Sequence, residues 1–201
     1  CGLTQHEVDQ LRRMFDVTRA TLLFARGIIL VEGITEALLL PVLSRRLGMP
    51  LEDKAISVIP ICGVSFLTIS KLFGENKLKI PVSIITDGDP DTVVPEGAYD
   101  YGWRNEVPKK DDIGNFEISK RVKKLKDILA QNEVVHVFNS QVTLEYDLAF
   151  AGYRNADIMC DAWERCFQSG SGPKTFNRDI LEKCGDSLEN RALAVWRGIC
   201  R

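Results

Sequence analysis

Short apolar runs alternate with amphipathic stretches along the first two-thirds of the chain. Four of the runs have the length and composition of strands, and they cover residues 27–31, 56–61, 82–86 and 134–138. The run Ile28-Ile29-Leu30-Val31 is apolar at every position, which suits a strand covered on both faces, as in a parallel sheet. Strands that alternate with helices are joined by right-handed crossovers in such sheets. The pattern therefore predicts an α/β fold with a parallel sheet of about four strands flanked by helices.

Helical periodicity fills the intervening segments, and the pattern turns wholly helical after about Thr143. The expected helices cover residues 4–25, 65–73, 117–131, 155–167, 176–184 and 188–199, and a further helix follows Gly33 and is closed by Gly48. The polar stretch 90–117 is longer than an ordinary connection, so it is either functional or mobile. We therefore expect an N-terminal helix over 1–26, a catalytic α/β domain over 27–150 and a helical subdomain over 151–201.

The helix after Gly33 carries several specific expectations. Thr35 is a suitable N-cap, Pro41 predicts a kink, and Gly48 is placed to close the helix. Its core side is expected to consist of Leu38, Leu39, Val42, Leu43 and Leu47.

The composition excludes several classes of protein. The net charge of −2 provides no general basic surface, so a nucleic-acid partner would need local patches or bound cations. No apolar run reaches the length of a membrane span. Six cysteines without a C-x-x-C pair and only two histidines argue against zinc and fit a reducing cytoplasm. Because the chain begins with Cys1 in helical sequence, we expect a fragment of a longer protein.

Acidic residues follow two of the predicted strands. Glu32 follows the first strand, with Glu36 four residues later, and Asp87 and Asp89 follow the third. The carboxyl ends of parallel strands meet at one edge of a sheet, where sites form. Oxygen ligands suit Mg²⁺ or Mn²⁺, which would also relieve the repulsion between facing carboxylates. Two such ions about 3.5–4 Å apart support phosphodiester hydrolysis by a metal-activated water.

Each acid taken alone has a simpler explanation. A glutamate after a strand is commonly a helix cap or a solvated side chain, and a D-x-D in a loop is more often a turn than a metal site. The spacing of the acids across two strand ends is more specific than any single one of them. Glu32 and Asp87 have the stronger support, whereas Asp89 depends on its two-residue offset.

The same segments resemble a known family. LFARGIILVEG at residues 23–33, followed by TEALLLP at 35–41, is similar to the entry into the Toprim domain of the overcoming-lysogenisation-defect (OLD) nucleases. Toprim domains carry a glutamate after the first strand and a D-x-D after the third, which Glu32 and Asp87-Gly88-Asp89 match. TLEYDL at 143–148 resembles a later acidic motif of the family. The likeness covers about residues 20–150 well and the helical tail more loosely.

The resemblance implies two metal sites and a lysine from the tail. We assign Glu32 and Asp87 to one ion, and Glu36, Asp89 and Glu145 to the second. Lys174 is the chosen lysine, with Lys183 in reserve, and its role would be to stabilise transition-state charge. Glu145 is equally well explained as an acid at a helix N-terminus, and Lys174 as a solvated lysine.

The resemblance also implies partners. In the family the nuclease region follows an ATP-hydrolysing domain of the ABC type. The chain has no G-x-x-x-x-G-K-[ST] motif, so ATP is expected only through a missing N-terminal domain. A helicase is a further candidate partner, and phage defence is a candidate role.

Basic side chains are candidates for contacts with DNA. Arg121 and Lys126 share their predicted helix with several lysines, and a solvated helix face explains this cluster equally well. The candidates are Lys120, Lys123, Lys124 and, in the long polar stretch, Arg104.

We therefore expect a cytoplasmic, Mg²⁺- or Mn²⁺-dependent DNA endonuclease with no membrane partner, in which Glu32 and Lys174 act in catalysis and no covalent intermediate forms. Two rival interpretations keep the fold: a primase-like or topoisomerase-like module, and a non-catalytic module that binds nucleic acid. Glu36 and Glu145 argue against the second rival, because a scaffold needs no second set of metal-binding acids.

Overall fold

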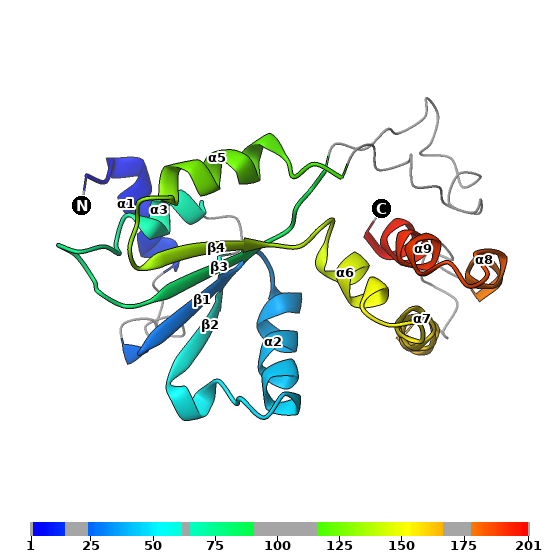
Figure 1. The fold of residues 1–201 in the computed structure, drawn as a ribbon. Coiled ribbons are helices and arrows are strands. Elements are labelled where there is room, and N and C mark those ends of the chain that lie inside the picture. Colours follow the sequence, from blue (N-terminus) through cyan, green and yellow to red (C-terminus); the bar gives the residue numbers. More distant parts are fainter. Residues whose placement is uncertain (1, 15–23, 62–64, 91–115, 167–177, 201) are drawn as a thin grey trace. The chain divides into compact units, whose positions relative to one another are not determined.

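The computed structural model describes residues 2–14, 24–61, 65–90, 116–166 and 178–200. Its contacts divide the chain into two compact units, the first comprising residues 1–86 and 120–139 and the second residues 87–119 and 140–201. The elements of the first unit are α1 (Gln5–Met14), β1 (Gly27–Val31), α2 (Ile34–Arg46), the 3₁₀ helix η2 (Glu52–Lys54), β2 (Ile56–Pro60), α3 (Phe66–Ser70), β3 (Val82–Thr86), α5 (Lys120–Leu129) and β4 (Val135–Asn139) (Figure 1).

The four strands form one parallel sheet in the order β2-β1-β3-β4. Val31 at the end of β1 is level with Pro60 of β2 and with Ile85 of β3. Leu30 and Ile84, on the two central strands, are fully buried. The predicted α/β fold with a parallel four-stranded sheet is therefore confirmed, and β1 and β3 end side by side.

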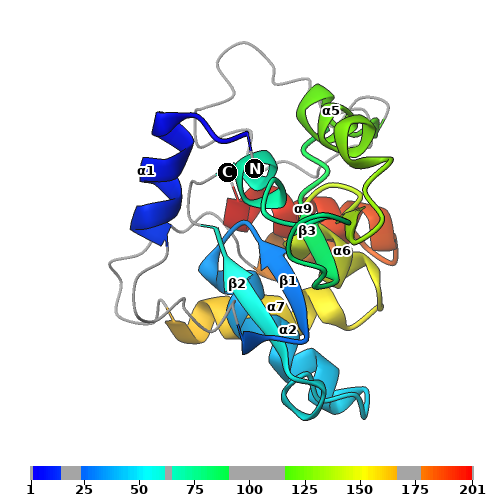
Figure 2. The ribbon, with the colours of Figure 1, turned by 90° about the vertical axis from the view of Figure 1, so that its left-hand side faces the viewer.

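Helices cover both faces of this sheet. Figures 1 and 2 show α1, α3 and α5 on one face and α2 on the other. On α5, Val122, Leu125 and Leu129 are buried at a spacing of three and four residues, which is the stripe that a sheet-covering helix presents. Of the helix expected over 4–25, α1 accounts for Gln5–Met14, and residues 15–23 lie outside the described residues.

The prediction for the core side of α2 is wrong. None of the residues of α2 is buried, and Leu38 is 69% exposed. Val42 and Leu47 are also exposed. The physical reason is that residues 37–43 are all apolar and occupy every side of the helix, so the pattern does not define a core face.

The start of α2 also differs from the prediction. Its N-cap is Gly33, which has an extended backbone, and Thr35 lies inside the first turn. The helix continues through Pro41 and ends as expected, because Gly48 takes the left-handed conformation (φ 72°) that ends helices.

The second unit contains the expected C-terminal helices. They are α6 (Leu144–Phe150), α7 (Asn155–Cys166), α8 (Arg178–Lys183) and α9 (Leu188–Cys200). Their core includes Tyr146, whose ring stacks on Phe150 with a centroid distance of 5.8 Å. The buried Arg191 of α9 pairs with Asp157 of α7 at 2.7 Å and donates to the Leu181 carbonyl of α8 at 3.1 Å. One cation thus joins three helices.

The two compact units do not follow the predicted divisions at residues 26 and 150. The first unit combines the sheet with α1, and the described residues 87–90 and 116–119 belong with the C-terminal helices. A compact unit is defined by contacts within the folded chain, whereas an evolutionary domain is defined by inheritance as a unit. The predicted division at residues 26 and 150 therefore stays a prediction. Across the described segments, no helix has both the length and the apolar character that crossing a membrane requires.

Candidate functional site

Glu32 lies where the two central strands end. It directly follows β1, and because Val31 is level with Ile85 of β3, Glu32 comes level with Thr86. The buried Thr86 hydroxyl donates a hydrogen bond to Oε1 of Glu32. The guanidinium of Arg121, from α5, donates to the same oxygen at 2.9 Å. Glu32 is therefore an oriented, half-buried carboxylate with a cation beside it.

Glu36 lies in the first turn of α2, next to the same strand end. Its Oε2 accepts a hydrogen bond from the backbone N–H of Gly33 at 3.0 Å. This is the glutamate half of a capping box, which satisfies a donor at the start of the helix. A carboxylate has two oxygens, so the cap and a metal ligand are compatible roles, and the ligand role of Glu36 stays a prediction.

The Asp87-Gly88-Asp89 loop is attached to the loop that follows β4. The hydroxyl of Ser140 donates to Oδ1 of Asp87 at 3.3 Å and accepts from the N–H of Gly88 at 3.2 Å. The N–H of Asp89 donates to the carbonyl of Val142 at 3.1 Å. Such contacts fix the backbone that carries both aspartates.

Gly88 is required by the close approach of these two loops. A Cβ at this position would lie 2.5 Å from the carbonyl oxygen of Ser140 and 2.6 Å from that of Gln141. Asp89 has a left-handed φ of 43°, which aspartate tolerates better than most residues. The D-G-D motif is therefore a turn packed closely at the buried Gly88, whereas Asp89 itself is exposed.

The same contacts bring two sequence motifs together. Oδ1 of Asp87 accepts the backbone N–H of Leu144, the first residue of α6, at 3.1 Å. Thr143 is the N-cap of α6, and its side chain accepts the N–H of Tyr146. Glu145 follows Leu144 in the first turn of α6. The motifs at 87–89 and 143–148, which the sequence singled out separately, are thus neighbours in the second unit.

Asp147 of α6 contacts the backbone of the loop that follows β4. Its two carboxylate oxygens accept the N–H of Gln141 at 3.2 and 3.0 Å. Burial raises the pKa of Asp147 above its ordinary value, although hydrogen bonds from the backbone of Gln141 and Val142 oppose the shift. Asp147 thus holds the loop that contacts Gly88.

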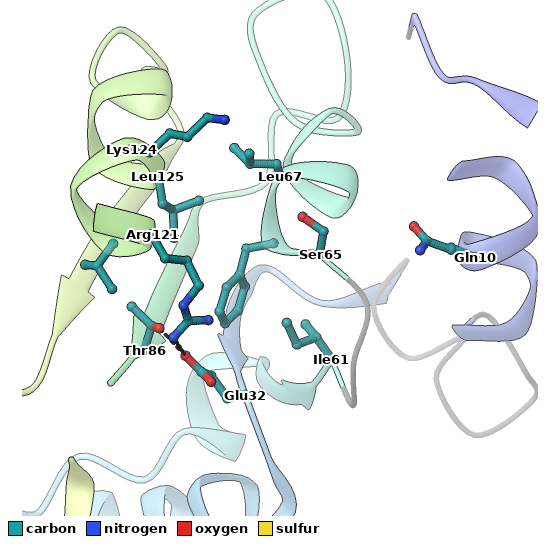
Figure 3. A pocket seen from close by; sticks show the side chains of 11 residues that line it. Gln10, Glu32, Ile61, Ser65, Leu67, Thr86, Arg121, Lys124 and Leu125 are labelled. Atoms are coloured by element: carbon teal, nitrogen blue, oxygen red, sulfur yellow. Dashed lines mark hydrogen bonds and ion pairs between the residues drawn. The ribbon is translucent and has the colours of Figure 1, made fainter. Parts of the chain in front are cut away.

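A cavity of about 450 Å³ opens beside Glu32 in the first unit (Figure 3). In Figure 3, Arg121 reaches from α5 to Glu32, and Leu67 of α3 faces Leu125 of α5. The apolar lining consists of Ile61, Phe66, Leu67, Val122 and Leu125, and the polar lining consists of Gln10, Glu32, Ser65, Thr86, Arg121 and Lys124. The cavity therefore combines an apolar wall with one acid and two cations.

The sequence of the region that carries these acids matches a known family. Residues 23–89 match the family model described as the overcoming lysogenization defect protein-like Toprim domain. The matched region begins just before β1 and ends at Asp89, so it contains both strand-end pairs of acids. This segment is therefore similar to the OLD-like Toprim family. The resemblance predicted from the sequence is confirmed.

Two solved structures are similar to this chain. The C-terminal region of the Burkholderia pseudomallei OLD protein is 26% identical, with a TM-score of 0.47, over 85% of this chain and 87% of that one. The C-terminal region of the Xanthomonas campestris pv. campestris OLD protein, phased with platinum, is 22% identical, with a TM-score of 0.45, over 87% of this chain and 85% of that one. No curated protein matches the chain.

Toprim domains generally bind divalent metal ions, and the acids of this chain provide suitable donors. Carboxylate oxygens are the hard ligands that Mg²⁺ and Mn²⁺ prefer. Glu32 already has a cation as its partner, and Asp87 lies in a fixed turn. Glu32 and Glu36 belong to the first unit, and Asp87, Asp89 and Glu145 belong to the second. Within the part of the chain that the structure describes, no three His, Cys, Asp or Glu side chains form a metal-binding group.

The remaining candidate residues differ in their surroundings. Lys124 lines the cavity beside Glu32, whereas Lys120 and Lys123 are exposed on α5 and are not part of its lining. Lys174 and Arg104 lie outside the described residues.

Sequence reasoning did not select three residues that contact the candidate acids, namely Thr86 and Arg121 at Glu32 and Ser140 at Asp87. Thr86 has a visible signal, because it ends the strand that precedes Asp87. Arg121 has no such signal in the sequence, because several lysines on the same helix carry the same charge.

Proposed function

We propose that this chain is a divalent-metal-dependent DNA endonuclease that hydrolyses phosphodiester bonds at its Toprim acids. The observation that carries the proposal is the hydrogen bond from Thr86 to Glu32. It joins the ends of β1 and β3, and Asp87 is the next residue after Thr86. Glu32 and Asp87 are therefore linked through a single residue, Thr86, and this link supports the proposal of a shared metal site.

The roles follow the assignment made from the sequence. Glu32 and Asp87 would hold one ion, and Glu36, Asp89 and Glu145 would hold the second. Ions bound there would supply Lewis acidity and neutralise the charge that develops during phosphodiester hydrolysis.

The protein's own groups orient these ligands. The Thr86 hydroxyl fixes the rotamer of Glu32, and the packed turn at Gly88 fixes Asp87 and Asp89. Ligands held in place by surrounding hydrogen bonds lose less entropy when a cation binds. Lys174 is proposed to stabilise the transition state, and an ABC-type ATPase domain is the proposed partner.

The deciding experiment is cleavage of supercoiled plasmid with Mg²⁺ or Mn²⁺. We expect nicking by the unmodified chain and a loss of about 10²-fold or more in Glu32→Gln and Asp87→Asn. Asp53→Asn is the matched control, because Asp53 is an exposed acid of η2, outside the proposed site. Absence of cutting, or equal cutting by all four proteins, would refute the proposal. Nucleotide incorporation in a primer-synthesis assay would instead favour the primase-like rival.

Metal binding is a separate test of the assignment. Calorimetric titration with Mn²⁺ should give a stoichiometry of two ions per chain, and Glu36→Gln should remove one of them. A stoichiometry of one in the unmodified chain would eliminate the second metal site.

A further inference from the structure

The ion pair between Arg121 and Glu32 joins the basic helix to the Toprim acid. Both side chains are partly open to solvent, with 53% of Arg121 and 34% of Glu32 exposed. Ion pairs in such surroundings are worth little, so another cation can replace the arginine at low cost. Glu32 is also the carboxylate that the proposed function assigns to a metal ion. A metal ion bound to Glu32 would therefore place a second positive charge beside the guanidinium of Arg121.

The position of Arg121 on α5 gives its guanidinium a second environment. Arg121, Lys124 and Leu125 are three and four residues apart, and all three line the cavity beside Glu32. Figure 3 shows the arginine extending along this cavity to reach the acid. A guanidinium is a planar fork of donors that matches a phosphate as well as a carboxylate. If Glu32 were neutralised by a metal, a phosphate at the cavity would be the alternative acceptor.

We propose that Arg121 is a metal-gated phosphate-binding residue. In the metal-free protein its guanidinium neutralises Glu32. When a divalent cation binds Glu32, two positive groups share one carboxylate group, and their repulsion releases the arginine. The released guanidinium then binds a backbone phosphate of DNA at the cavity. This inference rests on two parts of the proposed function, namely that a divalent cation binds Glu32 and that the chain binds DNA. It does not depend on the cleavage of phosphodiester bonds.

The salt dependence of DNA binding tests the gate directly. A short duplex is titrated with the unmodified chain and with Arg121→Gln, in EDTA and in Ca²⁺, at several salt concentrations. Removing one phosphate contact lowers the slope of log affinity against log salt by about 0.9. We expect this decrease in Ca²⁺ and no decrease in EDTA, where Arg121 is paired with Glu32. Equal slopes in Ca²⁺, or the same decrease in both conditions, would overturn the inference.

Two further variants control for charge and for folding. Arg46→Gln removes an arginine from the exposed last turn of α2 and should match the unmodified chain in both conditions. Arg121→Lys keeps the positive charge and should keep the slope. A decrease in Arg46→Gln equal to that in Arg121→Gln would show a general charge effect and would contradict the gate.

A metal-free double-mutant comparison separates this inference from the nuclease proposal. In EDTA, Glu32→Gln should release Arg121 and increase DNA affinity, with the slope steeper by about 0.9. The double variant Glu32→Gln, Arg121→Gln should lose that increase in slope, and a retained increase would overturn the gate. Plasmid cleavage is measured in parallel. If the chain shows the gated slopes but does not cut DNA, the nuclease proposal fails and the role of Arg121 stands.

Discussion

Oδ1 of Asp87 accepts a hydrogen bond from the backbone N–H of Leu144 at 3.1 Å. This bond connects the acid that follows β3 to the first residue of α6, 57 positions later in the chain. It satisfies one of the backbone donors that a helix N-terminus leaves unpaired. Asp87 therefore has a structural role in addition to its proposed role as a metal ligand, and the two roles respond differently to substitution.

Asp87→Asn and Asp87→Ala separate these roles. Asparagine retains an oxygen that can accept from Leu144, so the free energy of unfolding should change little. Alanine removes the acceptor and should lower the free energy of unfolding by about 1 kcal/mol. Both variants should lose plasmid cleavage, because neither provides an anionic ligand. Urea unfolding and nicking assays on the same preparations measure the two effects. Cleavage by Asp87→Asn at the unmodified rate would remove Asp87 from the metal site.

The strands were predictable because their pattern is local. Each apolar run is bounded by polar or Gly-containing sequence, and a run such as Ile28–Val31 is compatible with a buried strand and with little else. The core face of α2 was not predictable, since its apolar residues surround the helix and only the tertiary structure decides which side is covered. Leu38 shows the result, because it is apolar but 69% exposed.

The positions of the candidate acids were predictable from strand ends, but the side chains that contact these acids were not. Glu32 and Asp87 follow strands that the pattern identifies. Arg121 and Ser140 contact them only because α5 and the loop after β4 return to the carboxyl edge of the sheet, and sequence spacing contains no information on which of several cations or hydroxyls will be closest.

Gly88→Ala tests the close packing of the D-G-D turn. The added methyl group would lie 2.5 Å from a backbone oxygen of Ser140, so the turn or the facing loop must move. We expect a loss of about 1–3 kcal/mol in the free energy of unfolding and a loss of cleavage.

Gly27→Ala is the control for this substitution. Its new methyl group would meet the Cγ1 atom of Ile56 at 3.3 Å, and a side chain can adjust more easily than backbone. Thermal denaturation of both variants gives the comparison. A smaller loss in Gly88→Ala than in Gly27→Ala would contradict the packing described for the turn.

Leu38→Ala and Leu30→Ala test the exposure of α2 against the burial of β1. Leu30 is fully buried, and its truncation should cost about 2–5 kcal/mol. Leu38 has most of its side chain in solvent, so the same truncation should change the free energy of unfolding by less than about 0.5 kcal/mol. Chemical denaturation measures both. A large loss in Leu38→Ala would show that the apolar surface of α2 is covered in solution.

The buried phenol of Tyr146 should make the folded state less stable at alkaline pH. Burial raises the pKa of its phenol from 10.0 to about 12, with smaller contributions from the charges of Glu189 and Asp147. Because the folded state holds this proton more tightly than the unfolded state, the contribution of Tyr146 to stability is complete below pH 10.0 and is lost as the pH rises through about 12.

Tyr146→Phe has no proton to lose at this position. We therefore expect its free energy of unfolding, measured in urea between pH 8 and about 11, to decline less steeply than that of the unmodified chain. Burial also raises the pKa values of the Cys160 and Cys184 thiols, but both proteins contain these groups, so their effect cancels in the difference. Parallel declines in the two proteins would show that the phenol of Tyr146 titrates as it does in the unfolded chain.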